Sequence, residues 1–182
     1  MAVVYNVAID QGADWFITYI YKQPAEITDI TSDGTTVVFT AVNGFSAGQI
    51  VSIDGVLPSQ YNFQNVTVNS ATTSQFTITN GATGTYISGG LATAPVNITG
   101  YTAALQLRSN PSDATAVLSL TSSDGITITG NSGRIDVHAT AAKTTIIDEG
   151  PYVYDLEITD PSSGVVTRVA QGQAIVSAEV TR

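Results

Sequence analysis

Apolar and polar residues alternate along much of the chain, with the period of two that is typical of β-strands. The segment Tyr152–Asp160 is the clearest case. Its first, third, fifth and seventh residues are Tyr, Tyr, Leu and Ile, while Asp155 and Glu157 lie on the opposite face. Because successive side chains of a strand point to opposite faces, this pattern predicts one buried and one wetter face.

A second alternating segment, Asp14–Tyr21, has large apolar side chains on both faces. Trp15, Ile17 and Tyr19 share one face, and Phe16 and Ile20 share the other. The interpretation we favour is a strand that is buried on both faces of a sandwich. The alternative is that Phe16 and Ile20 form a subunit interface, since exposed apolar patches usually mark contacts.

Between two prolines, Pro24 and Pro95, the chain consists of short β-like runs separated by Gly-containing turns such as Asn43-Gly44, Asn80-Gly81 and Gly89-Gly90. Strands with turn signals every 8–12 residues indicate a small β-barrel or sandwich. The predicted runs are Glu26–Thr31, Thr35–Ala41, Gln49–Asp54, Asn62–Asn69, Gln75–Thr79 and Gly84–Ile87.

Strand-like runs continue after Pro95, with only Ala139–Ile147 showing helical character. The last two runs, Val165–Gln171 and Ala174–Val180, predict a terminal hairpin. We therefore predict an all-β protein: a discontinuous β-sandwich of residues 1–24 and 95–182, interrupted by an inserted small β-barrel or sandwich module of residues 25–94. The two proline necks should lie side by side, because the ends of an inserted domain are usually close together.

Composition supports this fold class. The chain has 182 residues, of which 26 are Thr, 19 Val and 17 Ile against 7 Leu. β-Branched residues fit a pleated surface, and their excess favours strands over helices. Hydrophobic residues make up 43% of the chain, which is enough for a core.

Charge and cysteine content exclude several classes of function. The net charge is −9 and the six Lys and Arg residues are scattered, so neither nucleic acid nor an anionic membrane is an expected partner. There is no cysteine, hence no disulfide, thiolate nucleophile or Cys-based zinc site. No signal peptide or membrane-spanning run is evident.

Catalytic signals are weak. Asp155 and Glu157 are the best carboxylate pair, but outward charges that keep a sheet soluble explain them without a glycosidase site. His138 is the only histidine and no G-x-S-x-G motif accompanies it. No calcium-loop or nucleotide-binding pattern occurs. We expect no catalytic residue, no metal and no cofactor, and therefore no enzyme.

Three aromatic residues of the inserted module, Phe45, Tyr61 and Phe63, have two interpretations. We favour a place in the core of the small module. The alternative is an aromatic patch at its tip that contacts a partner or a host glycan.

The outer segments resemble a known group of proteins. Four segments are similar to short tailed-phage virion proteins, and their pattern is similar to the N-terminal domain of baseplate upper proteins: Tyr5–Asp14, Val96–Arg108, Tyr152–Asp160 and the ending from Val165-Val-Thr-Arg-Val-Ala-Gln-Gly to Glu179-Val-Thr-Arg182. Gly44–Gly55 is similar to a module recurring in phage structural proteins. Family members run straight from the first hairpin into the Thr-Gly-Tyr strand, whereas this chain carries an insertion there.

The resemblance implies an immunoglobulin-like β-sandwich and a place in the virion, after assembly in the host cytoplasm. Its first implication is a tail or baseplate component that adapts fibres or spikes, as a homo-oligomer among other virion proteins. The alternatives are a capsid decoration (cement) protein and a glycan-binding module. All six Lys and Arg lie outside residues 25–94, which hold four acidic residues. We therefore expect the sandwich to dock to the particle and the insert to face outward.

Overall fold

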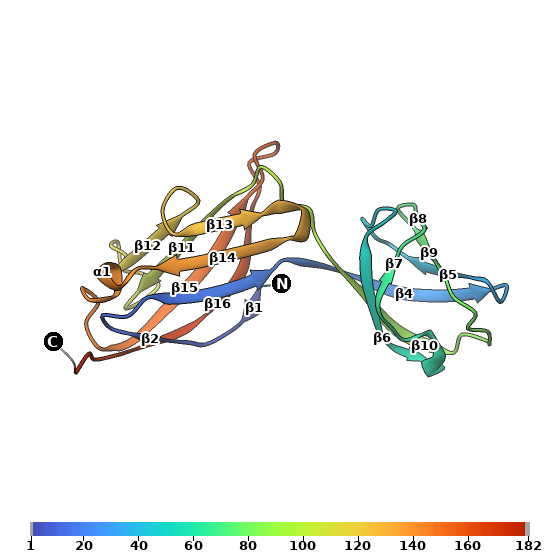
Figure 1. Ribbon diagram of the computed structural model, residues 1–182, viewed down its shortest axis with the longest axis horizontal. Helices are drawn as coiled ribbons and strands as arrows, with labels where there is room; N and C mark the ends of the chain where they lie inside the picture. The colour runs from blue at the N-terminus through green and yellow to red at the C-terminus, as the bar shows by residue number, and fades with distance from the viewer. Residues whose placement is uncertain (1, 181–182) are drawn as a thin grey trace. The chain divides into compact units, whose positions relative to one another are not determined.

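The computed structural model describes residues 2–180, and it is built almost wholly of β-strands (Figure 1). The chain divides into two compact units. One comprises Met1–Tyr21 with Asn97–Arg182, and the other is Lys22–Val96. We call them the sandwich unit and the insert. The all-β prediction is confirmed, and the insert begins three residues before and ends two residues after the predicted range 25–94.

The sandwich unit consists of two sheets in two layers, with the three-stranded sheet in front of β15 and β16 in Figure 1. The larger sheet has the order β1-β16-β15-β11-β12, with β2 also paired to β16, and the smaller has the order β13-β14-β3. The strands are β1 (Val3–Val4), β2 (Val7–Asp10), β3 (Trp15–Ile20), β11 (Thr102–Arg108), β12 (Leu118–Thr121), β13 (Ile126–Thr129), β14 (Arg134–Ala139), β15 (Gly150–Thr159) and β16 (Val166–Ser177).

The core of the sandwich unit lies between these sheets because each strand presents alternate apolar side chains inward. Leu105, Leu120, Ile135 and Leu156 are all fully buried. The predicted inner face of Tyr152–Asp160 is confirmed, since its two tyrosines, Leu and Ile are buried. The helical expectation for Ala139–Ile147 reduces to the four-residue α1 (Ala141–Thr144).

The predicted terminal hairpin is wrong, because β16 runs unbroken from Val166 to Ser177. Gly172, which falls in the turn of the predicted hairpin, instead lies where the segment between β1 and β2 approaches β16 closely. A Cβ atom there would lie 2.2 Å from the backbone oxygen of Tyr5. Strands β1 and β2 pair in parallel with β16 before and after this close approach.

The insert is one antiparallel sheet of seven strands, in the order β7-β6-β10-β4-β5-β9-β8. Strands β7 and β8 lie at opposite ends of this order, yet only Val68 and Asn69 separate them in the chain. The sheet must therefore curl upon itself. The strands are β4 (Lys22–Ser32), β5 (Thr36–Ala41), β6 (Ile50–Leu57), β7 (Phe63–Thr67), β8 (Ser70–Ala71), β9 (Gln75–Thr79) and β10 (Ser88–Pro95).

One prediction for the insert, its last strand, is wrong, and another, the position of its two necks, is confirmed. The last strand is not Gly84–Ile87 but Ser88–Pro95, which contains the Gly89-Gly90 pair taken as a turn. Gly89 has φ +75° and faces the carbonyl oxygen of Gly55, at 2.6 Å from an added Cβ, so the pair serves close strand packing. The two necks do lie side by side, because β10 pairs with β4 with Thr93 opposite Pro24.

No helix formed by residues 2–180 has the length and apolar character needed to cross a membrane.

Candidate functional site

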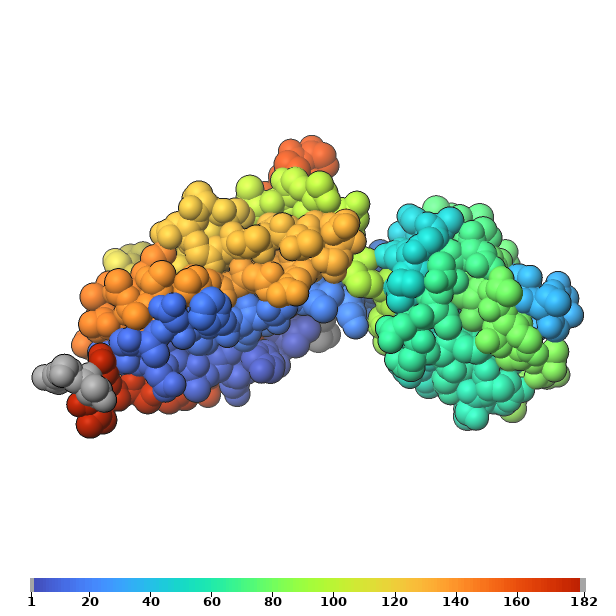
Figure 2. Space-filling model, viewed as in Figure 1, coloured from blue at the N-terminus to red at the C-terminus, as the bar shows by residue number. Residues whose placement is uncertain are grey.

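The outer face of β3 presents two large apolar side chains to solvent. Phe16 is 66% exposed and Ile20 is 50% exposed, whereas Trp15 is buried at 8%. The favoured prediction of a strand buried on both faces is therefore wrong. The described residues of the sandwich unit form two sheets, so no further sheet of this unit covers the outer face of the smaller one. We call Phe16, Thr18 and Ile20 the β3 surface. The chain segment that contains β3 is blue and lies at the front of its unit in Figure 2.

Neighbouring side chains hold Phe16 in a fixed position. Its ring is stacked on the imidazole of His138, with the ring centroids 4.1 Å apart and the planes 10° from parallel. His138 Nε2 lies 3.3 Å from Asp14 Oδ2, and Asp14 Oδ1 accepts the N–H of Ala141 at 2.6 Å. The bond from Ala141 and the contact with His138 lower the pKa of Asp14 below its usual value. The contacts of His138 with Phe16 and Asp14 thus orient the Phe16 ring at the surface.

The polar groups beside the β3 surface already have partners. Thr18 donates its hydroxyl proton to Asp136 at 2.6 Å, and Arg134 Nε forms an ion pair with the same carboxylate at 2.7 Å. In the register of the sheet Phe16 lies opposite His138 and Ile20 opposite Arg134. Besides Thr18, which is exposed but bonded to Asp136, the exposed side chains of β3 are the apolar Phe16 and Ile20.

Strand β3 also forms an edge of its sheet. Within residues 2–180 its backbone pairs with β14 alone, over Trp15–Ile20 and without a bulge. An edge strand presents unpaired N–H and C=O groups, which can pair with another strand. Exposed apolar side chains and an open edge on one strand together make this the best candidate for an interaction surface.

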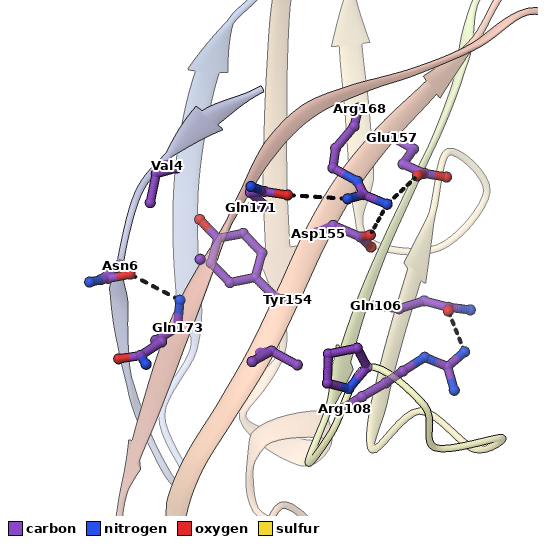
Figure 3. Close-up of a pocket in the computed structure, with 13 residues that line it drawn as sticks. Val4, Asn6, Gln106, Arg108, Tyr154, Asp155, Glu157, Arg168, Gln171 and Gln173 are labelled. Atoms are coloured by element: carbon purple, nitrogen blue, oxygen red, sulfur yellow. Dashed lines mark hydrogen bonds and ion pairs between the residues drawn. The ribbon is translucent and has the colours of Figure 1, made fainter. Parts of the chain in front are cut away.

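A second candidate is a groove of about 720 Å³ on the outer face of the larger sheet (Figure 3). It contains the predicted carboxylate pair, and Arg168 lies between the two side chains. The guanidinium is 3.2 Å from Asp155 Oδ2 and 3.4 Å from Glu157 Oε1, and it also donates to Gln171 at 3.1 Å. The sequence predicted the shared face of the carboxylates but not the arginine.

The geometry of the groove does not favour acid–base catalysis. A general acid and a general base need environments that push their pKa values apart. Asp155 and Glu157 instead share one guanidinium and have equal side-chain exposure, 36% each. Polar and apolar residues line the rest of the groove, and some of the polar ones are already bonded: Arg108 donates to the Gln106 side chain at 2.6 Å, and the backbone N–H of Gln173 donates to the Asn6 side chain at 2.9 Å. The groove is large enough for a small polar molecule, and both of its carboxylates are bound to Arg168.

The three aromatic residues of the insert do not form a tip patch. Tyr61 is fully buried, Phe45 is 7% exposed, and Phe63 is partly buried and packs against the same core. Their rings fill the curled sheet: Phe45 meets Phe76 edge-on at 5.2 Å, and the hydroxyl of Tyr61 donates to Gly84 O at 2.8 Å. The prediction of a core role is confirmed. The exposed large apolar residues of the insert are Val42, Ile50, Leu57, Ile87 and Leu91.

His138 has Asp14 as its hydrogen-bonding side-chain partner, and its ring face is covered by Phe16. No serine hydroxyl bonds to His138 within the described residues, so the components of a Ser-His-Asp relay are not brought together there. Nor does the described part of the chain contain a group of three His, Cys, Asp or Glu side chains that could hold a metal ion.

Neither a protein-family model nor a curated protein matches this sequence.

Proposed function

We propose that this protein is a non-enzymatic structural subunit of a tailed-phage virion, a tail or baseplate component that adapts fibres or spikes to the tail. The observation that carries the proposal is the β3 surface, where Phe16 and Ile20 are exposed on an open sheet edge. Such a surface suits protein–protein contact rather than catalysis. The virion context comes from the resemblance of the outer segments to phage structural proteins.

We also propose that the sandwich unit is immunoglobulin-like, and three features support this. Its two sheets have the strand content of a variable-type arrangement, in which the first strand joins the larger sheet. Strands β1 and β2 run parallel to the last strand, β16. The hydroxyl of Tyr152, near the start of β15, donates to the carbonyl of Asp148 at 2.9 Å, which is the bond that defines a tyrosine corner.

The position of the insert agrees with an adaptor. It replaces the connection between β3 and β11, two strands of different sheets, and loops at the ends of a sandwich are where binding segments usually lie. Its acidic residues have no basic counterpart between residues 25 and 94. In the proposed arrangement the sandwich unit docks to the particle and the insert faces outward.

Two alternatives differ from this proposal in their measurable consequences. A capsid decoration protein would use the same contact surface, but at hundreds of copies per particle rather than tens. A glycan-binding insert would need exposed aromatic rings for sugar stacking, and Phe45 and Tyr61 are buried. The burial of these rings disfavours the glycan-binding insert, and the copy number per particle separates the tail or baseplate role from the capsid role.

The experiment is quantitative mass spectrometry of purified particles from a phage that encodes the chain. Tens of copies per particle, at a fixed ratio to known tail proteins, are the expected result. A matched phage carrying Phe16→Ser with Ile20→Ser should lose the protein from its particles while the soluble chain remains folded. Unchanged incorporation of that variant would refute the assigned surface, and absence of the wild-type chain from particles would refute the virion role.

A further inference from the structure

Two Asn-Gly pairs lie in the insert, and the role proposed above uses neither of them. They are Asn43-Gly44, which follows β5, and Asn80-Gly81, which follows β9. An Asn-Gly pair can modify itself, because glycine has no Cβ atom to keep its backbone nitrogen away from the amide carbon of the asparagine. Whether a pair reacts in a folded protein depends on how its amide is held, and the structure holds these two amides differently.

The two asparagine side chains share one feature. Each forms an Asx turn, in which the amide oxygen accepts the N–H two residues later. Phe45 donates to Asn43 Oδ1 at 3.0 Å, and Ala82 donates to Asn80 Oδ1 at 2.8 Å. A donor at this oxygen stabilises the negative charge that develops there when a nucleophile attacks the amide carbon. The Asx turn therefore favours attack in both pairs and does not distinguish them.

The nitrogen of each amide does distinguish the pairs. Asn43 is 7% exposed, and its Nδ2 donates to the carbonyl of Ala41 at 2.8 Å. Because this amide is bonded at both ends and shielded from water, it cannot rotate or release its nitrogen while the insert is folded. Asn80 is partly exposed, Gly81 is exposed, and Nδ2 of Asn80 forms no hydrogen bond within residues 2–180. Water can therefore reach this amide, and no bond holds its nitrogen.

From this contrast we propose that Asn80 is a site of spontaneous deamidation and that the fold protects Asn43. The backbone nitrogen of Gly81 attacks Cγ of Asn80 and loses its proton, and the Cγ–Nδ2 bond breaks as Nδ2 leaves as ammonia. Water then opens the five-membered succinimide ring at either of its carbonyl carbons, which yields aspartate or isoaspartate. The reaction consumes one water molecule and needs no oxidant or cofactor. The site lies within the insert and does not depend on the virion role.

The two products differ in their effect on the turn. In the aspartate product a carboxylate oxygen can still accept the Ala82 N–H, so the turn persists. In isoaspartate the main chain runs through Cβ and Cγ and is one bond longer. The extra bond displaces Ala82, whose carbonyl accepts the Ser32 hydroxyl at 2.6 Å, relative to the Asn80 N–H, which donates to Thr35 O at 3.0 Å. Isoaspartate should therefore weaken these two hydrogen bonds.

Either product adds a carboxylate to the insert. Residues 25–94 contain four acidic residues and no basic one, so the new charge has no basic side chain in this range to pair with. The net charge of the chain would change from −9 to −10. The surface of the insert would thus become more acidic as the protein ages.

Incubation of the folded chain at neutral pH, followed by peptide mapping with mass spectrometry, tests the site. The peptide containing Asn80 should convert at least about tenfold faster than the peptide containing Asn43, which reacts only when its region opens. In guanidinium chloride the fold is lost, and the two pairs should react within about twofold of each other. If Asn43 stayed protected in guanidinium chloride, the fold would not be the cause of its protection and the proposal would fail.

The substitution Gly81→Ala is the matched variant, because it leaves Asn80 in place. An added Cβ would lie 3.7 Å from Gly34 O, an ordinary contact, and Gly81 is not in the left-handed region, so the variant should fold. Its Cβ hinders the approach of the backbone nitrogen, and conversion of Asn80 should slow by about tenfold. Conversion at the wild-type rate in a folded Gly81→Ala chain would refute the succinimide route. Equal conversion of the two peptides in the folded wild-type chain would overturn the proposal whether or not the variant folds.

Discussion

The substitution Phe76→Ala should unfold the insert while the sandwich unit stays folded. Phe76 is fully buried on β9, with the ring of Phe39 stacked at 4.8 Å and that of Phe45 edge-on at 5.2 Å. Removing a buried phenylalanine costs about 3–5 kcal/mol, and the loss of two aromatic partners places this site in the upper half of that range. A unit of roughly 75 residues has a total stability of about 4–11 kcal/mol. The variant insert should therefore be marginally stable or unfolded.

The protein contains a built-in probe that separates the two units. Trp15 is the single tryptophan, and it is buried in the sandwich unit. Tryptophan emission during urea unfolding thus reports on that unit, whereas far-ultraviolet circular dichroism reports on both. For Phe76→Ala we expect part of the circular-dichroism change to occur at a lower urea concentration than in the wild type. The urea concentration at the midpoint of the tryptophan-emission transition, the tryptophan midpoint, should be unchanged.

The matched control for this prediction is Leu105→Ala, at a fully buried position between the sheets of the sandwich unit. It should lower the tryptophan midpoint by the equivalent of about 2–5 kcal/mol, and the urea midpoint for unfolding of the insert should not change. If Phe76→Ala shifts the tryptophan midpoint together with the circular-dichroism signal, the two units unfold as one and the reasoning is refuted.

Three further changes test individual contacts. Gly172→Ala should destabilise the sandwich unit by about 1–3 kcal/mol in urea unfolding, because its Cβ would meet the Tyr5 carbonyl, and an effect below about 0.5 kcal/mol would contradict this close approach. Tyr154→Phe removes the hydroxyl that donates to Tyr5 O at 2.6 Å and accepts from Tyr19 at 2.8 Å, so the tryptophan midpoint should fall by the equivalent of about 1–3 kcal/mol. Hydrogen bonds from backbone and side chain lower the pKa of Asp33 from 3.8 to about 2, so its contribution is complete above about pH 4 and lost as the pH falls towards 2. Asp33→Asn should accordingly destabilise the insert at pH 6, with a difference from wild type that closes near pH 2; a difference independent of pH would contradict this.

Alternation along the chain predicted which side chains of β15 and β3 face inward, because the period of a strand is fixed by its backbone. It could not decide whether Phe16 and Ile20 are covered. That depends on how many layers the fold has, and both faces of β3 are apolar in the sequence. The two aromatic residues Phe45 and Tyr61 were placed correctly in the core of the insert, since a small module must use its largest apolar side chains to fill it.

The main errors in the fold predicted from the sequence concern glycine residues. Gly172 and the Gly89-Gly90 pair suggested turns, but each allows another backbone segment to approach a strand closely. A close approach depends on residues distant in the chain, here Tyr5 and Gly55, so no local pattern reveals it. The position of Arg168 between Asp155 and Glu157 was missed for a similar reason. The pairing of β15 with β16 shifts at a bulge between Leu156 and Glu157, and the sequence does not specify that shift.

The central claim is that this protein is a structural subunit of a phage particle, held there by its β3 surface. The most direct test is the copy number of the chain in purified particles, for the wild type and for the Phe16→Ser, Ile20→Ser variant side by side. The account predicts tens of wild-type copies per particle and loss of the variant, with both chains folded in solution. A wild-type chain absent from the particles would contradict it.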